Sequence, residues 1–238
     1  TKEPTVLLDG KKLKIKEIKT NISLKLLIFN EFSLEDLQIS TKNIKLEDLI
    51  LLVRSFKNST ELFILDRVIK SGSFTADIKL EFDEKGNIKK NYQIRGFIKN
   101  VKLNFLNKIK VRNLGFKFDI QKNKYSLMKI KGDIDLIKLS SPLIEINQKK
   151  NKFLITGKIL TDKKELNREQ INTIGVNFLQ NQNIEKIRFS SENDFSFNIN
   201  KKLKIKNLGI QSKVNIDQLV VKNNFVKVKS YLPNLEEL

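Results

Sequence analysis

Apolar and polar side chains alternate along most of this chain, which is the period of a β-strand with one buried face. In the clearest run, Phe74, Ala76, Ile78, Leu80 and Phe82 are separated by Thr, Asp, Lys and Glu. Similar runs cover residues 5–29, 32–41, 92–105, 109–120, 125–146, 153–159 and 184–228. Short polar turns join them, and such turns favour antiparallel neighbours because parallel crossovers need a dozen or more residues. The pattern therefore predicts a long antiparallel meander.

Two stretches change to a helical period. Residues 45–57 place apolar side chains at i, i+3, i+4, i+7 and i+10, which is one face of a helix. Residues 62–69 suit a second short helix, and Asn167 with Gln170 three positions later resembles a capping box. We therefore expect a single elongated unit over residues 1–238, with helical insertions near 45–69 and 167–180.

One basic strand motif recurs along the chain. Lys108–Phe116 reads KIKVRNLGF and Lys202–Ile210 reads KLKIKNLGI, while Lys12–Ile18 is a weaker copy that lacks the Asn and the Gly. Lysine alternates with an apolar residue in each copy, so each copy predicts a strand with one wet and one apolar side. The recurrence suggests a sheet that is extended by repetition.

The alternation slips by one residue at three places. The slips lie at Lys99–Asn100, Asn113–Leu114 and Asn207–Leu208, each within or beside an apolar run. A slip of this kind predicts a β-bulge, which bends a strand. We expect Gly115 and Gly209 to allow the curl, because glycine in a strand marks bulges and tight bends.

Composition limits the possible functions more than it limits the possible folds. The 238 residues include 46 Lys and Arg against 27 Asp and Glu, a net charge of +19, and no Cys, His or Trp. Without His or Cys, the commonest general base and metal ligands are absent, which argues against an enzyme. The charge indicates an anionic partner such as nucleic acid, acidic lipid head groups or lipopolysaccharide. An AT-rich genome, which favours Lys, Asn, Ile and Phe, would also explain it.

Few residues could carry chemistry. Asp133 and Asp135 lie two apart in a strand pattern, so they face one side as an acid pair or metal site, or as a solvent face beside Lys131 and Lys138. No serine has a histidine to activate it, and no phosphate-binding loop or dinucleotide fingerprint occurs. We expect no catalytic residue, no metal site and no cofactor.

Nucleic-acid binding calls for aromatic side chains interleaved with lysine on one strand face. Here Phe116 and Phe118 share a face with Ile120, and Lys117 points to the other side. That arrangement is typical of a core more than of a stacking platform.

The apolar face of such a sheet must be covered. It can fold over as a sandwich, close as a barrel, or curl into a groove that leaves apolar surface for a ligand such as lipid acyl chains. We expect a mainly β fold, a long, strongly curved antiparallel sheet forming a groove, with two or three short helices. The expected lipid-binding residues are Phe74, Ile78, Leu80, Ile94, Ile98, Val101, Leu103, Ile109, Val111, Phe116, Phe118 and Ile120.

The block from Gly72 to Leu160 resembles the repetitive central part of the AsmA-like superfamily, which includes TamB and YhdP. The resemblance rests on Tyr92–Val101 (YQIRGFIKNV), Lys129–Ile134 (KIKGDI) and Leu139–Ile144 (LSSPLI). The strand-then-helix segment Ile39–Leu49 (ISTKNIKLEDL) also resembles a pattern that recurs in these proteins.

The resemblance implies a curled β-sheet with a hydrophobic interior, similar to the eukaryotic bridge-like lipid transfer proteins. Such proteins are anchored in the bacterial inner membrane, reach through the periplasm toward the outer membrane, and are implicated in moving phospholipid. The chain opens on Thr1 directly in a strand pattern, without an anchor, so we expect a segment cut from a longer protein. The alternatives are a closed β-sandwich that serves as a structural or interaction module, and a basic nucleic-acid-binding protein.

Overall fold

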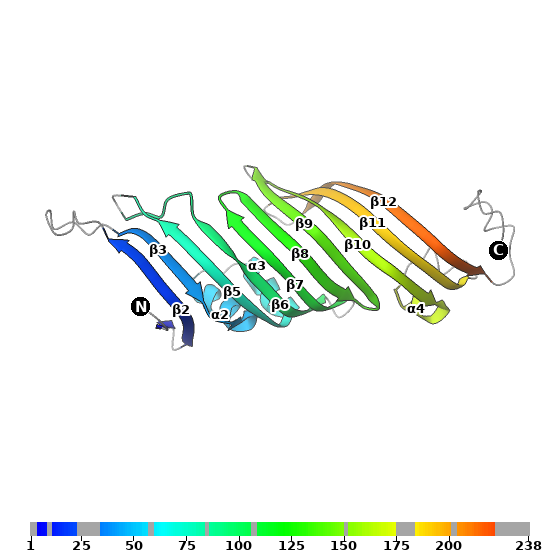
Figure 1. Ribbon diagram of the computed structural model, residues 1–238, viewed down its shortest axis with the longest axis horizontal. Coiled ribbons are helices and arrows are strands. Elements are labelled where there is room, and N and C mark those ends of the chain that lie inside the picture. Colours follow the sequence, from blue (N-terminus) through cyan, green and yellow to red (C-terminus); the bar gives the residue numbers. More distant parts are fainter. Residues whose placement is uncertain are drawn as a thin grey trace.

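The computed structural model describes residues 4–8, 11–22, 34–56, 60–83, 86–105, 109–149, 152–174, 184–200 and 204–221. In these ranges the protein is one large antiparallel sheet that does not close into a barrel, accompanied by three short helices (Figure 1). The expected mainly β, antiparallel fold is therefore confirmed. Strand predictions for residues 23–29 and 222–228, and the helical prediction for 175–180, lie outside the described residues.

The strands are β1 (Thr5–Leu8), β2 (Lys11–Ile22), β3 (Leu34–Thr41), β4 (Ile44–Lys45), β5 (Ile69–Glu81), β6 (Gln93–Phe105), β7 (Ile109–Gln121), β8 (Lys124–Ile134), β9 (Ile137–Lys149), β10 (Lys152–Asn167), β11 (Ile184–Asn200) and β12 (Ile205–Val221). The helices are α2 (Leu46–Phe56), α3 (Thr60–Val68) and α4 (Arg168–Ile174). The strands follow chain order across the sheet, except that the short β4 pairs with β5 beside β3.

The strand registers align apolar side chains across one face of the sheet, which we call the apolar face. One row crosses nine neighbouring strands from β2 to β11, and its members are Ile18, Ile39, Ile78, Ile94, Ile120, Tyr125, Ile146, Ile155 and Phe197. Because side chains alternate in a strand, the residues next to them point to the other face, which we call the polar face. The alternation in the sequence is therefore kept in register across most of the sheet.

A line of bulges, which we call the crease, crosses the neighbouring strands β6, β7 and β8. Asn100, Asn113 and Lys129 each have a left-handed backbone there, with φ of 55°, 53° and 53°. The strand registers shift beside each of them. The slips predicted at Asn100 and Asn113 are thus confirmed as bulges, which bend and twist strands.

Register shifts lie at Gly115 and Gly209, as expected, but asparagine takes the left-handed conformation in these bulges. Asn207 has φ of 53° in β12, as Asn113 has in β7, whereas Gly115 and Gly209 have no positive φ. Asparagine takes the left-handed conformation at low cost because its short polar side chain bonds locally. At the crease, Asn113 Nδ2 donates a hydrogen bond of 2.6 Å to Asp133 Oδ2 on β8.

Replacing Asn113 with valine is expected to lower the free energy of unfolding by about 1–3 kcal/mol, because a β-branched residue is strained in this conformation. Asn113→Gly, which suits the backbone but removes the hydrogen bond, is the control and should cost less. Urea unfolding of both variants measures the difference. A valine variant as stable as the glycine variant would contradict the strain.

The helices lie toward the lower ends of the strands in Figure 1. In the helical hairpin α2–α3, Arg54 forms an ion pair with Asp66, and Arg54 and Arg67 lie over the ring of Phe63, 5.6 Å and 4.6 Å from its centroid. The hairpin packs on β5 and β6. The predicted helices at 45–57 and 62–69 are thus confirmed as α2 and α3.

The short helix α4 connects β10 to β11 and packs against both strands. The predicted capping box is present, because Asn167 and Gln170 exchange two backbone-to-side-chain hydrogen bonds of 3.0 Å. Ile171 of α4 is buried with Leu166, Ile184 and Ile187. This cluster fixes α4 against the ends of the two strands.

Candidate functional site: an apolar groove

The apolar face is hollowed into a groove of about 530 Å³ between β2–β4 with helix α2 on one side and β5–β8 on the other. Its lining is apolar except for Thr41, and consists of Ile15, Ile39, Thr41, Ile44, Leu49, Phe74, Ile78, Ile94, Ile98, Phe116, Phe118, Ile120 and Leu127. The volume lies in the range of pockets that bind small molecules. No lining residue is ionisable, so the groove offers neither a general acid nor a general base.

The groove brings together seven of the twelve residues expected to bind lipid. They are Phe74, Ile78, Ile94, Ile98, Phe116, Phe118 and Ile120, from the three strands β5, β6 and β7. Pairing explains why they meet, since Ile78 pairs with Ile94, and Ile94 pairs with Ile120. Their shared side of the alternation on neighbouring strands was enough to predict that they lie together.

The other five residues lie elsewhere. Val101 and Val111 are buried, at 3% and 8% exposure, beyond the crease, and Leu103 pairs with Val111 there. Leu80 pairs with Leu37 on β3, outside the groove lining. Ile109 begins β7, and its side chain lies outside the described residues. The crease thus separates an open part of the apolar face from a packed part.

The packed part is covered by helix α2. A side chain at Gly72 would meet Leu46 Cδ1 at 2.6 Å and Val101 Cγ2 at 3.0 Å, so helix and sheet are in close contact there. The alternation of Val101 resembles that of the groove residues, and only the position of the helix distinguishes them. This contact joins residues that are far apart in the sequence.

Six lining residues were not among those expected. Ile15, Ile39 and Leu127 belong to predicted strands, while Ile44 and Leu49 come from β4 and α2. The helical period of residues 45–57 was a signal for Leu49, because one face of that helix had to be covered.

The sixth, Thr41, holds the strand junction beside the groove. β3 pairs with β5 as far as Ser40 and Asp77, and β4 resumes the pairing at Ile44 and Phe74. The backbone N–H of Ala76 lies between these ladders and donates a 2.8 Å hydrogen bond to Thr41 Oγ1. The buried hydroxyl therefore replaces a missing backbone carbonyl.

Thr41→Val is expected to lower the free energy of unfolding by about 1–3 kcal/mol, because it leaves the N–H of Ala76 buried without an acceptor. Thr41→Ser keeps the hydroxyl and is the matched control. Chemical denaturation measures both variants. Equal losses in the two would show that the hydroxyl does not matter.

Two phenylalanine rings each lie over a glycine on the neighbouring strand. Phe118 pairs with Gly96, and a side chain at Gly96 would lie 2.7 Å from Phe118 Cζ. Phe195 pairs with Gly157 in the same way, and Phe195 Cζ would be 2.9 Å away. Phe118 also stacks on Phe74, with ring centroids 5.6 Å apart. The glycines let these rings lie flat along the sheet.

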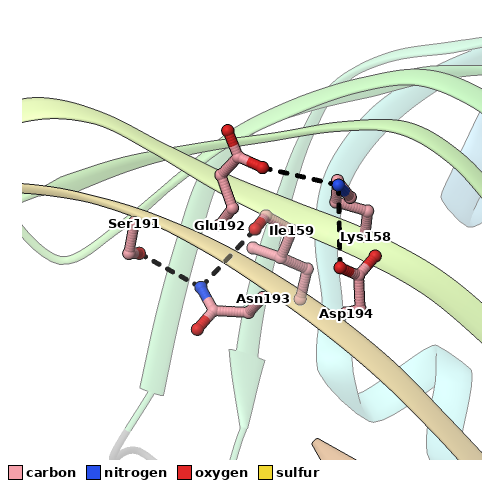
Figure 2. A network of polar contacts seen from close by, with 6 residues as sticks. All are labelled: Lys158, Ile159, Ser191, Glu192, Asn193 and Asp194. Carbon is pink, nitrogen blue, oxygen red and sulfur yellow. Dashed lines mark hydrogen bonds and ion pairs between the residues drawn. The ribbon is translucent and has the colours of Figure 1, made fainter. Parts of the chain in front are cut away.

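The apolar face changes character at β10 and β11. Alternation from Phe195 places Asn193 and Ser191 on this face, and Asn193 Nδ2 donates to Ser191 Oγ at 3.1 Å and to the carbonyl of Ile159 at 3.5 Å (Figure 2). On the polar face, Lys158 lies 3.4 Å from Glu192 and 3.6 Å from Asp194. A polar patch therefore interrupts the apolar face here.

The pKa values of two side chains reflect their surroundings in the sheet. Burial raises the pKa of the Tyr125 phenol, which lies in the long apolar row, and Tyr92 adds a smaller effect. Hydrogen bonds from Lys186 and then Arg188 lower the pKa of the exposed Glu165 carboxyl. Its contribution to stability is therefore present above the unfolded-state pKa and lost in acid, as pH falls through the folded-state value.

The acidic pair proposed from the sequence is not a pair in one strand. Asp133 lies in β8, but the strand ends at Ile134, and Asp135 is in the turn with φ of 51°. Alternation therefore does not hold across the two residues. In the part of the chain that the structure describes, no group of three or more His, Cys, Asp or Glu could hold a metal ion. No helix of the described ranges is long and apolar enough to span a membrane.

Comparison of the chain with family models, curated proteins and solved structures gave no match. The site is therefore interpreted from its geometry. It is an open, uncharged, apolar groove with no reactive group in its lining.

Proposed function

We propose that this protein is a non-enzymatic conduit for phospholipid or another acyl-chain lipid. The observation that carries the proposal is the groove of about 530 Å³, whose lining is apolar in twelve of thirteen residues. Each methylene group moved from water into such surroundings adds about 0.8 kcal/mol of favourable binding free energy. An acyl chain is the ligand that gains most from this lining, because it needs no polar partner.

The length of the apolar row favours transport over the carriage of one molecule. Nine strands in line at about 4.8 Å spacing extend for about 38 Å. That length exceeds the roughly 30 Å hydrocarbon core of a whole bilayer, and one leaflet is about half as thick. More than one lipid fits along the row, so lipids can follow one another along the sheet.

The resemblance to the AsmA-like superfamily supports a particular setting for this conduit. In that setting, the chain is part of a longer periplasmic protein anchored in the bacterial inner membrane, and lipid passes along the groove toward the outer membrane. The open, single-sheet architecture is compatible with such a segment, and the polar face would be in contact with water.

Lipid extraction tests the proposed function. The protein is purified without detergent, extracted with organic solvent, and the extract is analysed by mass spectrometry and phosphate assay. We expect phospholipid in amounts comparable to the protein. Protein that is free of lipid after this purification, and that does not take up a fluorescent phospholipid, would instead favour a structural or interaction module.

A further inference from the structure

The crease divides the polar face into two parts with different charge. Near the strand ends where α2 and α3 lie, five exposed cations are on β6–β9, and Lys99 lies at the crease beside Asn100. We call these six residues the basic patch: Lys99, Lys102, Lys110, Arg112, Lys131 and Lys138. Alternation from the buried Val101 and Val111 places Lys102, Lys110 and Arg112 on the polar face. The patch is therefore on the opposite side of the sheet from the groove.

Strand pairing brings the patch together. Arg112 on β7 pairs with Asp133 on β8, and Asp133 pairs with Lys138 on β9. Lys110 pairs with Asn104, two residues after Lys102 on β6. The four strands are neighbours at about 4.8 Å spacing, so the cations cover a surface about 15 Å across.

Three ion pairs lie on the opposite side of the crease. Arg95 lies 2.8 Å from Asp119, Lys124 lies 2.8 Å from Glu145, and Lys79 lies 3.5 Å from Glu81. None of the six patch cations forms an ion pair with another described residue. A genome rich in lysine codons explains the number of lysines, but it does not explain why these ion pairs lie on one side of the crease.

Two carboxylates lie with the patch in the described residues, Asp133 on β8 and Asp135 in the turn after it. Asp133 accepts the 2.6 Å hydrogen bond from Asn113 at the crease. The backbone N–H of Asp135 donates a 3.3 Å hydrogen bond to the carbonyl of Lys110, so this second acid lies beside the patch. Two acids against six cations leave a net positive field, and exposed cations without partners are available to an external anion. The patch therefore has the electrostatics of a binding surface.

We propose that the basic patch docks the protein on an anionic membrane surface. A second observation supports this partner. The α2–α3 hairpin packs on the other, apolar face at the same ends of the strands (Figure 1). It exposes Leu51, Phe63 and Leu65 by 41%, 41% and 44%, with Arg67 over the Phe63 ring. Exposed apolar side chains and cations at the same strand ends are typical of a surface that binds at the lipid interface, where acyl chains and phosphates are adjacent.

A nucleic acid suits this surface less well. Single strands are held by exposed aromatic rings that stack on bases. The aromatic residue beside the patch, Phe97, has its ring covered by Lys99, whose Nζ lies 4.6 Å from the centroid. A lipid surface needs no such platform.

The test is co-sedimentation of the whole chain with vesicles of phosphatidylcholine, with or without phosphatidylglycerol. We expect binding only to the anionic vesicles, falling steeply as salt is raised. Each Lys or Arg near an anionic surface is worth about fivefold in partitioning, so Lys102→Gln/Arg112→Gln/Lys131→Gln should bind about a hundredfold more weakly.

The charge-matched control removes three cations from the other side of the crease, as Lys79→Gln/Lys117→Gln/Lys124→Gln. It should lose much less affinity, and circular dichroism should show both variants folded. Equal losses in the two variants, vesicle binding that salt does not weaken, or binding of single-stranded DNA without vesicle binding would each overturn the proposal. The vesicle-binding test is separate from the test of the groove, because the amount of lipid extracted from the patch variant should equal that from the wild type.

Discussion

Glutamate at both Ile94 and Ile120 is expected to reduce co-purified phospholipid at least tenfold. The two side chains are paired neighbours in the middle of the groove. An acyl chain passing them would have to desolvate two carboxylates, and an isolated buried charge costs several kcal/mol after relaxation. Because the groove is open to water when it is empty, the sheet should still form.

The matched control places the same two charges on the polar face of the same strands. Gln93→Glu/Gln121→Glu changes the residues adjacent to Ile94 and Ile120 and makes the same change in net charge. Phosphate assay of protein purified without detergent gives the lipid content of both variants. If both retain wild-type amounts of lipid, the groove is not the path. A loss in both would point to net charge instead.

Gly96→Ala is expected to destabilise the protein by about 3 kcal/mol, the upper range for overpacking a well-packed site. The added methyl group would lie 2.1 Å from the carbonyl oxygen of Thr75, 2.7 Å from Phe118 Cζ and 2.9 Å from the Cα of Ala76. Two of these three atoms belong to the backbone. A rotamer change of Phe118 therefore does not relieve the contact, and β5 and β6 must separate.

Gly209→Ala is the control for this prediction, because the nearest atom to its added methyl is the carbonyl oxygen of Ser196 at 3.9 Å. It should change the free energy of unfolding by less than about 1 kcal/mol. Urea titrations monitored by circular dichroism compare the two variants. Similar stabilities would show that the backbone at Gly96 has more room than the structure indicates.

Alternation predicts the sheet well because each strand exposes one face and covers the other. The row through Ile78, Ile94 and Ile120 could be predicted from parity alone. Parity slips also located the crease, since a left-handed residue inserts one position into the pattern. Alternation does not say which residue adopts the left-handed conformation, because both Asn and Gly tolerate it and the motif holds both.

Parity could not separate the open part of the apolar face from the part beneath α2. Val101 has the same sequence pattern as Ile98, yet only Val101 is beneath the helix. Thr41 was missed for a related reason. Its hydroxyl matters because β3 and β4 leave a gap in the ladder of β5, and strand pairing of this kind cannot be read from side-chain alternation.

The two better copies of the repeated motif, which read in the same direction in the sequence, lie on strands of opposite direction in the sheet. β7 and β12, which hold its two better copies, are the sixth and eleventh strands of an antiparallel order, so they run in opposite directions. Asn113 and Asn207 therefore bend their strands in the same local way, but the two copies are not related by a simple translation along the sheet. The motif recurs as a local device for curvature.

The strand order has a consequence for how the chain folds and how it resists force. Apart from the junction of β3, β4 and β5, each strand in the described ranges pairs with strands next to it in the chain. Contacts between consecutive elements close short loops, so folding can begin at any hairpin and spread in both directions. Tension applied along the groove would peel strands away one by one from an end. Deleting one hairpin should shorten the sheet by about 10 Å and leave the remaining strands folded.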